Sequence, residues 1–334
     1  MTRWEVFRLI AAGLSPAAGG ARVPRTAADI PWAQVIEASS EHLVAPALGW
    51  VWRDDEQVPR EVADCLATLL ELNRQRNAII LRVVERAVAA LNAANLRPTL
   101  LKGAAALVDD LYPDPGMRVI ADVDLLLPDE SAAAAGAAAL DRAGFTRSTG
   151  RAPFDAAFHH LPARVDRETG ASLELHRSVV PARYGRLVDD GRARHVAMHW
   201  RGLEIALLEP TERLAHAIVH SQIVDEHYWR GVPRLRLLFE LAMLRQRDGH
   251  RIAFTEIEQR FARADFHRVL GETLAMSRAL IERPQATHGS DVMRRLEATV
   301  NRPSRRQWAI YARAVVRNAR RVIANPAFVL AALT

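Results

Sequence analysis

The sequence predicts an α+β protein in which a segment of alternating strands and helices lies between two helical regions. Three observations carry this prediction. Apolar residues recur at helical spacing in the first third of the chain, short apolar runs broken by glycine and proline follow, and helical spacing returns after Pro210. We therefore divide the chain into an N-terminal helical region (residues 1–95), a core (residues 96–205) and a C-terminal helical region (residues 206–334).

The N-terminal region contains one short and one long helix candidate. A short apolar helix is predicted within residues 1–30, before a loop at Gly19-Gly20. From Glu61 to Ala94, apolar side chains form one stripe at helical spacing. Pro98 ends this long helix, because proline disfavours helix in the residue before it.

Cysteine usage and the first residues of the chain bear on its compartment. Cys65 is the only cysteine, which excludes an internal disulfide and a cysteine-based zinc site. Because it lies in the apolar helical stretch, we predict that it is buried as a small hydrophobic residue. The first residues lack a signal-peptide pattern, and no apolar run is long enough to span a bilayer. These features favour a reducing cytoplasm and no transmembrane segment.

Strands and helices alternate in the core, and helices follow it. In the core we predict a buried strand at residues 99–101, a helix at 104–112 after a turn at Gly103, and a strand at 119–127 after a turn at Asp114-Pro115-Gly116. An alanine-rich helix at 132–143 is capped by Gly144, and strands at 158–161 and 172–176 follow, with a hairpin turn at 166–170. After the core we predict a helix capped by Thr211 and helices at 233–247, 254–282 and 307–323. The order strand, helix, strand, helix is typical of an α/β unit.

The chain is basic, with a net charge of +6 and an isoelectric point of about 10.3. A basic surface fits a polyanionic partner such as a nucleotide, RNA or acidic lipid, and a general bias toward arginine and alanine explains it equally well. Residues 305–321 interleave arginine with Trp308 and aliphatic residues. Such a helix would make peripheral contact with an anionic membrane or RNA, although packing of its apolar stripe on the protein is the simpler interpretation.

One lysine and two aspartates stand out in the core. Lys102 is the only lysine in a chain with 45 lysines and arginines. Because lysine is a compact point charge and arginine a planar fork, we infer that Lys102 fills a position that a guanidinium cannot. Asp122 and Asp124 alternate on the predicted strand, so they project to the same side. Such a pair is more often a solvated strand edge, but the apolar residues around this one favour a functional pair.

Glu174 and His176 repeat the same alternation on a later strand. If the two strands are neighbours, Glu174 adds a third carboxylate. Mg²⁺, with Mn²⁺ as the alternative, is held by carboxylates together with substrate phosphates, and three acids can hold two such ions. The pattern therefore predicts metal-assisted phosphoryl or nucleotidyl transfer.

The combined motifs resemble the uncharacterised nucleotidyltransferase-like family, a branch of the polymerase-beta-type nucleotidyltransferase superfamily. The resemblance covers roughly residues 40 to 250. It is carried by Leu101-Lys102-Gly103, Leu111-Tyr112-Pro113, Gly116-Met117-Arg118, Asp122-Val123-Asp124-Leu125-Leu126, Gly144-Phe145, Leu173-Glu174-Leu175-His176, His220 and Arg234-Leu235-Arg236-Leu237-Leu238.

The resemblance implies a mixed sheet with flanking helices and an ATP- or other nucleoside-triphosphate-binding site. It implies that Asp122, Asp124 and Glu174 are catalytic and bind Mg²⁺. It also implies that Gly103 begins a helix whose backbone amides face the phosphates. The superfamily commonly has Gly-Ser at this turn, whereas here Lys102-Gly103-Ala104 stands in its place. Either Lys102 replaces the serine contact to phosphate, or the protein holds the phosphates differently.

Several other side chains are candidates with competing interpretations. Arg118 would bind phosphate or position the carboxylates, and a salt bridge or helix cap is as good an explanation. His176 would orient the acceptor or assist its deprotonation, although a structural hydrogen bond is the simpler role. His159 and His160 are expected to face opposite sides, with His160 the one that reaches the site. Packing or acceptor binding is expected of the pair His216 and His220 rather than metal binding, and packing in the core is expected of Tyr112.

These observations predict an Mg²⁺-dependent nucleotidyltransferase. It would move a nucleoside monophosphate from a nucleoside triphosphate to a small molecule, a peptide or protein, or an RNA end. Two alternatives stay open. The first is a non-catalytic nucleotide- or RNA-binding protein on the same fold, or a partner subunit in a modification system. The second is a kinase-like or toxin-like protein that transfers another phosphate fragment.

Overall fold

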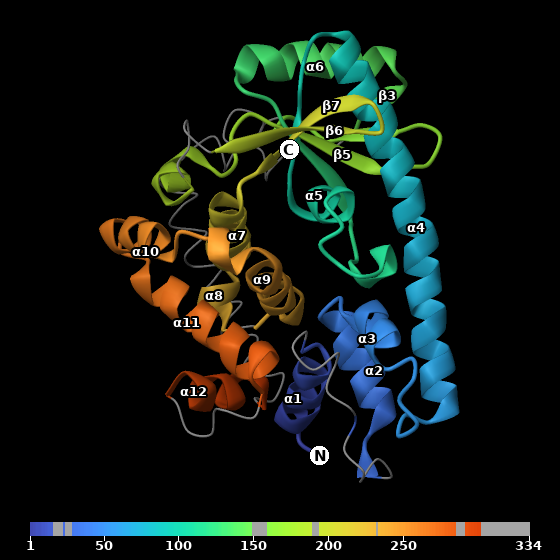
Figure 1. Cartoon of the computed structure of the whole chain (residues 1–334), viewed down its shortest axis with the longest axis vertical. Coiled ribbons are helices and arrows are strands. Elements are labelled where there is room, and N and C mark those ends of the chain that lie inside the picture. The colour runs from blue at the N-terminus through green and yellow to red at the C-terminus, as the bar shows by residue number, and fades with distance from the viewer. Residues whose placement is uncertain are drawn as a thin grey trace, which may run out of the picture.

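The computed structural model describes residues 1–15, 23, 29–148, 159–188, 194–231, 233–284 and 291–301. These residues form a mixed seven-stranded sheet at one end of the molecule and a helical assembly at the other (Figure 1). The α+β architecture with flanking helices is therefore confirmed. No helix in these ranges is both long and apolar enough to cross a bilayer.

The sheet has the strand order β3-β4-β5-β2-β1-β7-β6. Its strands are β1 (Thr99–Leu100), β2 (Asp122–Leu126), β3 (Phe145–Arg147), β4 (Arg164–Asp166), β5 (Ser172–His176), β6 (His195–Trp200) and β7 (Leu203–Leu208). The central strand β2 runs parallel to β5 and antiparallel to β1, and β1 runs parallel to β7. Strand β2 thus has a neighbour on each side, and every residue from Val123 to Leu126 is buried.

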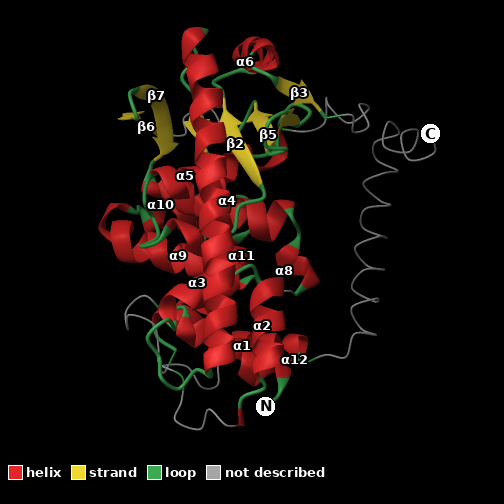
Figure 2. Ribbon diagram, turned by 90° about the vertical axis from the view of Figure 1, so that its right-hand side faces the viewer, coloured by secondary structure: helices red, strands yellow, loops and turns green. Residues whose placement is uncertain are grey.

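Helices cover the sheet and build the opposite end. They are α1 (Arg3–Gly13), α2 (Trp32–Glu41), α3 (Ala45–Val51), α4 (Arg60–Ala93), α5 (Lys102–Val108), α6 (Glu130–Arg142), α7 (Pro210–Ile218), α8 (His227–Arg230), α9 (Leu235–Asp248), α10 (Phe254–Arg263), α11 (His267–Ser277) and α12 (Asp291–Val300). Helix α4 runs from the helical end to the sheet (Figure 2). Its apolar stripe contributes Leu66 and Leu70 to one apolar cluster and Val84 and Leu91 to another.

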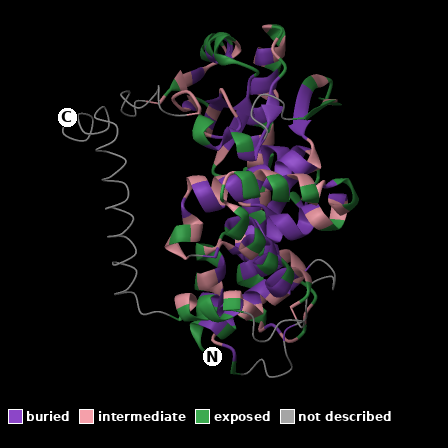
Figure 3. Cartoon of the chain, turned by 90° about the vertical axis from the view of Figure 1, so that its left-hand side faces the viewer, coloured by how far each residue is buried: buried purple, intermediate pink, exposed green. Residues whose placement is uncertain are grey.

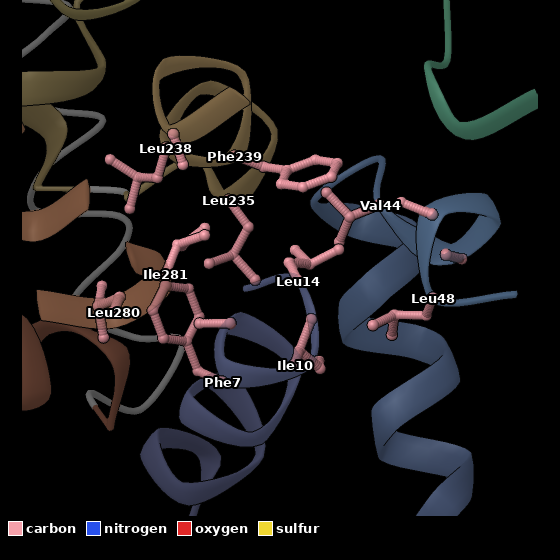
Figure 4. Packing of buried hydrophobic residues seen from close by; sticks show 14 of the residues in the cluster. Phe7, Ile10, Leu14, Val44, Leu48, Leu235, Leu238, Phe239, Leu280 and Ile281 are labelled. Carbon is pink, nitrogen blue, oxygen red and sulfur yellow. The ribbon is translucent and has the colours of Figure 1, made fainter. Parts of the chain in front are cut away.

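Residues from both ends of the sequence share one apolar cluster at the helical end. Phe7 of α1 and Leu14, which follows this helix, lie close to Leu235 of α9 and to Ile281, which follows α11 (Figure 4). All of these side chains are at most 2% exposed. Buried positions continue from this helical-end cluster toward the sheet (Figure 3). The division at residues 95 and 205 stays a prediction, and the packing joins the N-terminal and C-terminal helices into one assembly.

Most predicted elements are confirmed, with shifted ends. Helix α5 begins at Lys102 and ends at Val108, four residues earlier than expected. Strand β2 begins at Asp122 rather than at residue 119. The expected helix at residues 307–323 and the basic stretch at 305–321 lie outside the described residues.

Four expectations were wrong. Thr211 does not cap α7, because the N-cap is Glu209 and the Thr211 hydroxyl instead accepts a hydrogen bond from the amide of Ala253. His160 forms only an isolated bridge to His176, and the strand that pairs antiparallel with β5 is β4; Phe158 lies outside the described residues. Cys65 is exposed, not buried. The single helix expected at residues 254–282 is broken at residues 264–266 into α10 and α11. In addition, the hairpin of β6 and β7 was not predicted.

That hairpin has a recognisable turn. Arg201 (φ +52°) and Gly202 (φ +78°) connect the two strands and both have positive φ. Two consecutive positive φ angles are typical of a two-residue type I′ hairpin loop, which favours glycine. Gly202 between two apolar runs is therefore the sequence signal from which β6 and β7 could have been predicted.

Acid is expected to weaken the helical-end cluster through His42. Its ring packs edge-on against Phe7, with the ring centroids 5.2 Å apart. Burial, assisted by the charge of Arg234, lowers the pKa of His42 from 6.5 to about 4. The unfolded chain then binds more protons between pH 6.5 and pH 4, so this stability is complete above pH 6.5 and is lost as the pH falls through that window. The loss is up to about 3 kcal/mol.

Urea unfolding of the wild type and His42→Gln at pH 7.5 and pH 4.5 measures this effect. The variant should lose less stability on acidification than the wild type, because it has no imidazole to protonate. Equal losses in the two proteins would show that His42 does not carry the pH dependence. Comparing the loss of stability in the variant with the loss in the wild type cancels the contributions of the other histidines.

Candidate active site

The pairing of β2 with β5 brings the predicted acids together. The two strands are parallel, and their register places Asp124 beside Glu174 and Leu126 beside His176. Side chains on a strand alternate between the two faces, so Asp122 and Asp124 share one face of β2. In the sequence these strands are separated by a helix and a hairpin, and only the sheet makes them neighbours.

Three side chains in the described ranges have ligand atoms close enough together to hold one metal ion. One ligand atom each from Asp124, Glu174 and His176 lies within 4.8 Å of the others. His176 Nε2 is 2.9 Å from Asp124 Oδ1 and 3.7 Å from Glu174 Oε2. Asp122 shares the strand face of Asp124 but lies outside this group. Of the three predicted carboxylates, Asp124 and Glu174 therefore belong to this group, together with His176.

Lys102 reaches into the same group from the first residue of α5. Its Nζ donates a hydrogen bond to Asp124 Oδ1 over 2.8 Å. Burial lowers the pKa of Lys102, but attraction to Asp124, with smaller contributions from Asp122 and Glu174, outweighs burial and raises it overall. The ammonium group is thus a permanent cation beside the carboxylates.

The pKa values of the three carboxylates shift in different directions at this site. Burial alone would raise the pKa of Asp124, but Lys102 and the hydrogen bond from His176 hold it well below its usual value. Burial and the charge of Asp124 raise the pKa of Asp122. Burial also raises the pKa of Glu174, with Asp124 adding to the effect. Crowded anions of this kind attract a divalent cation, because the cation removes their mutual repulsion.

Three histidines meet at the end of β5. The ring centroid of His176 is 5.0 Å from that of His159 and 5.4 Å from that of His160. The expectation that only one of the adjacent pair reaches the site was therefore wrong, because no regular strand forces these two side chains to opposite faces. Burial lowers the pKa of His159 to about 2 and lowers that of His176, so both are neutral at pH 7.

The second histidine pair lies at the end of α7. His216 and His220 have ring centroids 6.0 Å apart, where α7 passes into a π-helical turn at Val219–Val224. His220 Nδ1 is 3.3 Å from Asp225 Oδ2. His216 is 3% exposed, and burial lowers its pKa well below the usual value. Neither belongs to the metal-binding group among the described residues.

Gly103 allows α5 to approach the loop that leads into β2. A Cβ atom at this position would lie 2.8 Å from Cγ1 of Ile120, closer than real Cβ contacts. Gly103 thus has a packing reason to be glycine. Helix α5 has only seven residues, from Lys102 to Val108. Its short length gives little macrodipole, so the role of its amides at phosphate stays a prediction.

Arg118 forms an ion pair with Glu240. Its Nη2 is 2.9 Å from Glu240 Oε2 of α9, and both side chains are 8% exposed. The carbonyl of Arg118 accepts hydrogen bonds from the side-chain amides of Asn73 and Asn77 of α4. The structure therefore gives Arg118 the salt-bridge role that the sequence left open, and Tyr112 is buried as expected.

The sequence did not lead us to three residues that hold the loop before β2 in place. Asn73 and Asn77 are buried and lie four residues apart within the apolar stripe of α4. Amides inside an apolar stripe must find hydrogen-bond partners, so their spacing was an available signal. The third, Glu240, is one acid in a leucine-rich helix, and nothing in the sequence connects it with Arg118.

Comparisons with known proteins identify the family of the chain. A profile of the family described as uncharacterised nucleotidyltransferase matches residues 28–282. Among solved structures, the chain is similar to an antigenic nucleotidyltransferase-like protein from Paracoccidioides brasiliensis, with 17% identity, a TM-score of 0.36, and coverage of 60% of this chain and 94% of that one. No curated protein matches significantly. Because the family profile spans most of the chain, this protein belongs to the uncharacterised nucleotidyltransferase family.

Proposed function

We propose that the protein is a Mg²⁺-dependent nucleotidyltransferase that uses a nucleoside triphosphate as donor. The observation that carries this proposal is the register of β2 and β5, which places Asp124 beside Glu174. With Lys102 at 2.8 Å from Asp124, carboxylates and a cation converge on one point of the sheet. Nucleotidyl transfer needs this combination, because negative charge accumulates on the phosphates during the reaction.

The donor set fits a divalent cation. Asp124 and Glu174 supply hard oxygen ligands, and Asp122 lies on the same strand face one pleat away. The imidazole of His176 is a ligand that Mn²⁺ accepts more readily than Mg²⁺, so Mn²⁺ is the alternative ion. Bound at these residues, the metal would neutralise phosphate charge and orient the attacking oxygen.

The remaining side chains have distinct roles in this proposal. In the absence of a metal, the Nε2–H group of His176 holds Asp124 in position through its hydrogen bond. Lys102 offsets the negative charge and offers its ammonium group to a phosphate. An acceptor oxygen attacks the α-phosphorus, the bond from this phosphorus to the bridging oxygen breaks, and pyrophosphate leaves. We assign the acceptor proton to Glu174, because its raised pKa makes it a better base than Asp124.

The acceptor belongs to one of three classes, namely a small molecule, a peptide or protein, or an RNA end. The net charge of +6 favours an anionic acceptor. Transfer of a nucleoside monophosphate adds a defined mass to its acceptor, so mass spectrometry of labelled products identifies both the class and the transferred group.

Calorimetry with each of the four ribonucleoside triphosphates, with and without Mg²⁺, tests the proposal. We expect the wild type to bind at least one of them in a Mg²⁺-dependent manner and Asp122→Ala/Asp124→Ala to lose this binding. The matched control is Asp54→Ala/Asp64→Ala, which removes two carboxylates that are 84% and 75% exposed. Binding that persists in Asp122→Ala/Asp124→Ala, or that needs no metal, would favour a non-catalytic nucleotide-binding protein instead.

A further inference from the structure

Lys102 is a cation held among side chains that suit a metal ion. Its Nζ contacts Asp124 Oδ1 at 2.8 Å, and the same oxygen accepts the hydrogen bond from His176 at 2.9 Å. Asp124 is 1% exposed and the Lys102 side chain 20% exposed. One oxygen of the buried carboxylate is thus already used by two donors.

The backbone of Lys102 is in an unusual conformation that keeps the ammonium group in this place. Its φ is +48°, a left-handed value that favours glycine and costs other residues about 1 kcal/mol. The preceding residue, Leu101, is extended, and its amide donates a hydrogen bond to the backbone carbonyl of Asp124 over 3.1 Å. This hydrogen bond joins the start of α5 to β2, and the strained Lys102 is the next residue in the chain. Strain of this kind persists where the surrounding structure requires it, and it is common at functional sites.

We propose that Lys102 is an internal counter-cation that competes with the divalent metal for Asp124 and moves to the nucleotide phosphates when metal and nucleotide bind together. This inference rests on the proposed function. An ammonium group and a divalent ion repel each other at contact distance, so metal alone binds weakly while Lys102 remains on Asp124. The phosphates of the nucleotide offer Lys102 a second anionic partner. Metal and nucleotide are then expected to bind cooperatively, each strengthening the other.

The length and shape of lysine suit this movement. Its flexible four-carbon stem lets one charge change partners, whereas the planar guanidinium of arginine is fixed by its several hydrogen bonds. This explains why the only lysine of an arginine-rich chain stands here. A purely structural ion pair would not need the flexible residue.

Mn²⁺ binding to Lys102→Met, measured by electron paramagnetic resonance without nucleotide, tests the competition. We expect the variant to bind Mn²⁺ about tenfold more tightly than the wild type, because a like charge has been removed from the site. In the presence of saturating Mn²⁺, calorimetry should show weaker nucleotide binding by the variant, since the phosphates have lost a partner. Opposite effects on the two ligands distinguish competition from general damage to the site.

Two further variants serve as controls. Lys102→Gln also removes the charge but retains a hydrogen-bond donor for Asp124. It should therefore bind Mn²⁺ about tenfold more tightly than the wild type, even if Lys102→Met folds poorly. Arg60→Met removes a charge from a side chain that is 92% exposed, and it should leave both affinities unchanged. Circular dichroism and thermal melting report whether each variant is folded.

The outcomes separate this inference from the proposed function. Unchanged or weaker Mn²⁺ binding by the folded Lys102 variants would overturn the counter-cation role, even if the wild type binds metal and nucleotide as proposed. Tighter Mn²⁺ binding without nucleotide binding in any of the proteins would support competition at Asp124 and overturn the nucleotidyltransferase proposal. If neither the wild type nor the variants bind Mn²⁺, with or without nucleotide, both are overturned.

Discussion

Asp124→Asn is expected to abolish metal-dependent nucleotide transfer while leaving the fold intact. Asparagine has nearly the same shape as aspartate, but it lacks the negative charge that a divalent cation and Lys102 both need. Asp124 is also the central member of the group, within hydrogen-bonding distance of Lys102 and His176. We expect transfer to fall about 1000-fold, the upper range for losing one group that stabilises charge in a transition state.

Labelling of acceptors by α-³²P-labelled nucleoside triphosphate, followed by mass spectrometry of the product, measures this loss. Asp54→Asn is the matched control, because it makes the same change at an exposed carboxylate. Since the variant leaves the Lys102 ammonium without its partner, Asp124→Asn/Lys102→Met should recover stability without recovering transfer. Full transfer by a folded Asp124→Asn protein would contradict the assignment of Asp124 as a catalytic residue.

Glu240→Gln is expected to cause the largest loss of stability. The variant leaves the guanidinium of Arg118 buried without its anionic partner, and Arg118 Nε already has no partner among the described residues. Breaking a buried ion pair from one side typically costs about 3–5 kcal/mol. We expect the free energy of unfolding measured in urea to fall by about this amount.

The double variant Arg118→Met/Glu240→Leu is the informative comparison. Replacing both ions with apolar side chains of similar size should restore most of the lost stability, because no buried charge is left unpaired. If this double variant also binds nucleotide normally, Arg118 is a structural residue and not a phosphate ligand. A Glu240→Gln protein that loses less than about 1 kcal/mol would contradict the ion pair as an important contact.

Local patterns in the sequence predicted the elements that carry the site. The strand at β2, the short helix after Leu101 and the strand at β5 were all expected from alternation, glycine turns and apolar runs. The same alternation placed Asp122 and Asp124 on one face and Glu174 and His176 on another strand. These predictions succeeded because each depends only on the backbone periodicity of a few neighbouring residues.

The exposure of Cys65 shows where local reasoning reached its limit. Cys65 is next to Leu66, which is 1% exposed, yet the cysteine itself is exposed. Successive residues on a helix are rotated by about 100°, so a neighbour of a buried residue can lie on the solvent side. The apolar content of a stretch therefore does not fix the burial of one residue within it.

The sequence by itself determined the α+β class, the order of most elements and the residues able to carry metal chemistry. Only the tertiary structure decided which of these residues meet. It paired β2 with β5 in register, brought His159 next to His176 and paired Arg118 with Glu240. The physical reason is that such contacts join residues far apart in the chain, so they depend on strand register and helix packing, to which distant parts of the sequence contribute together.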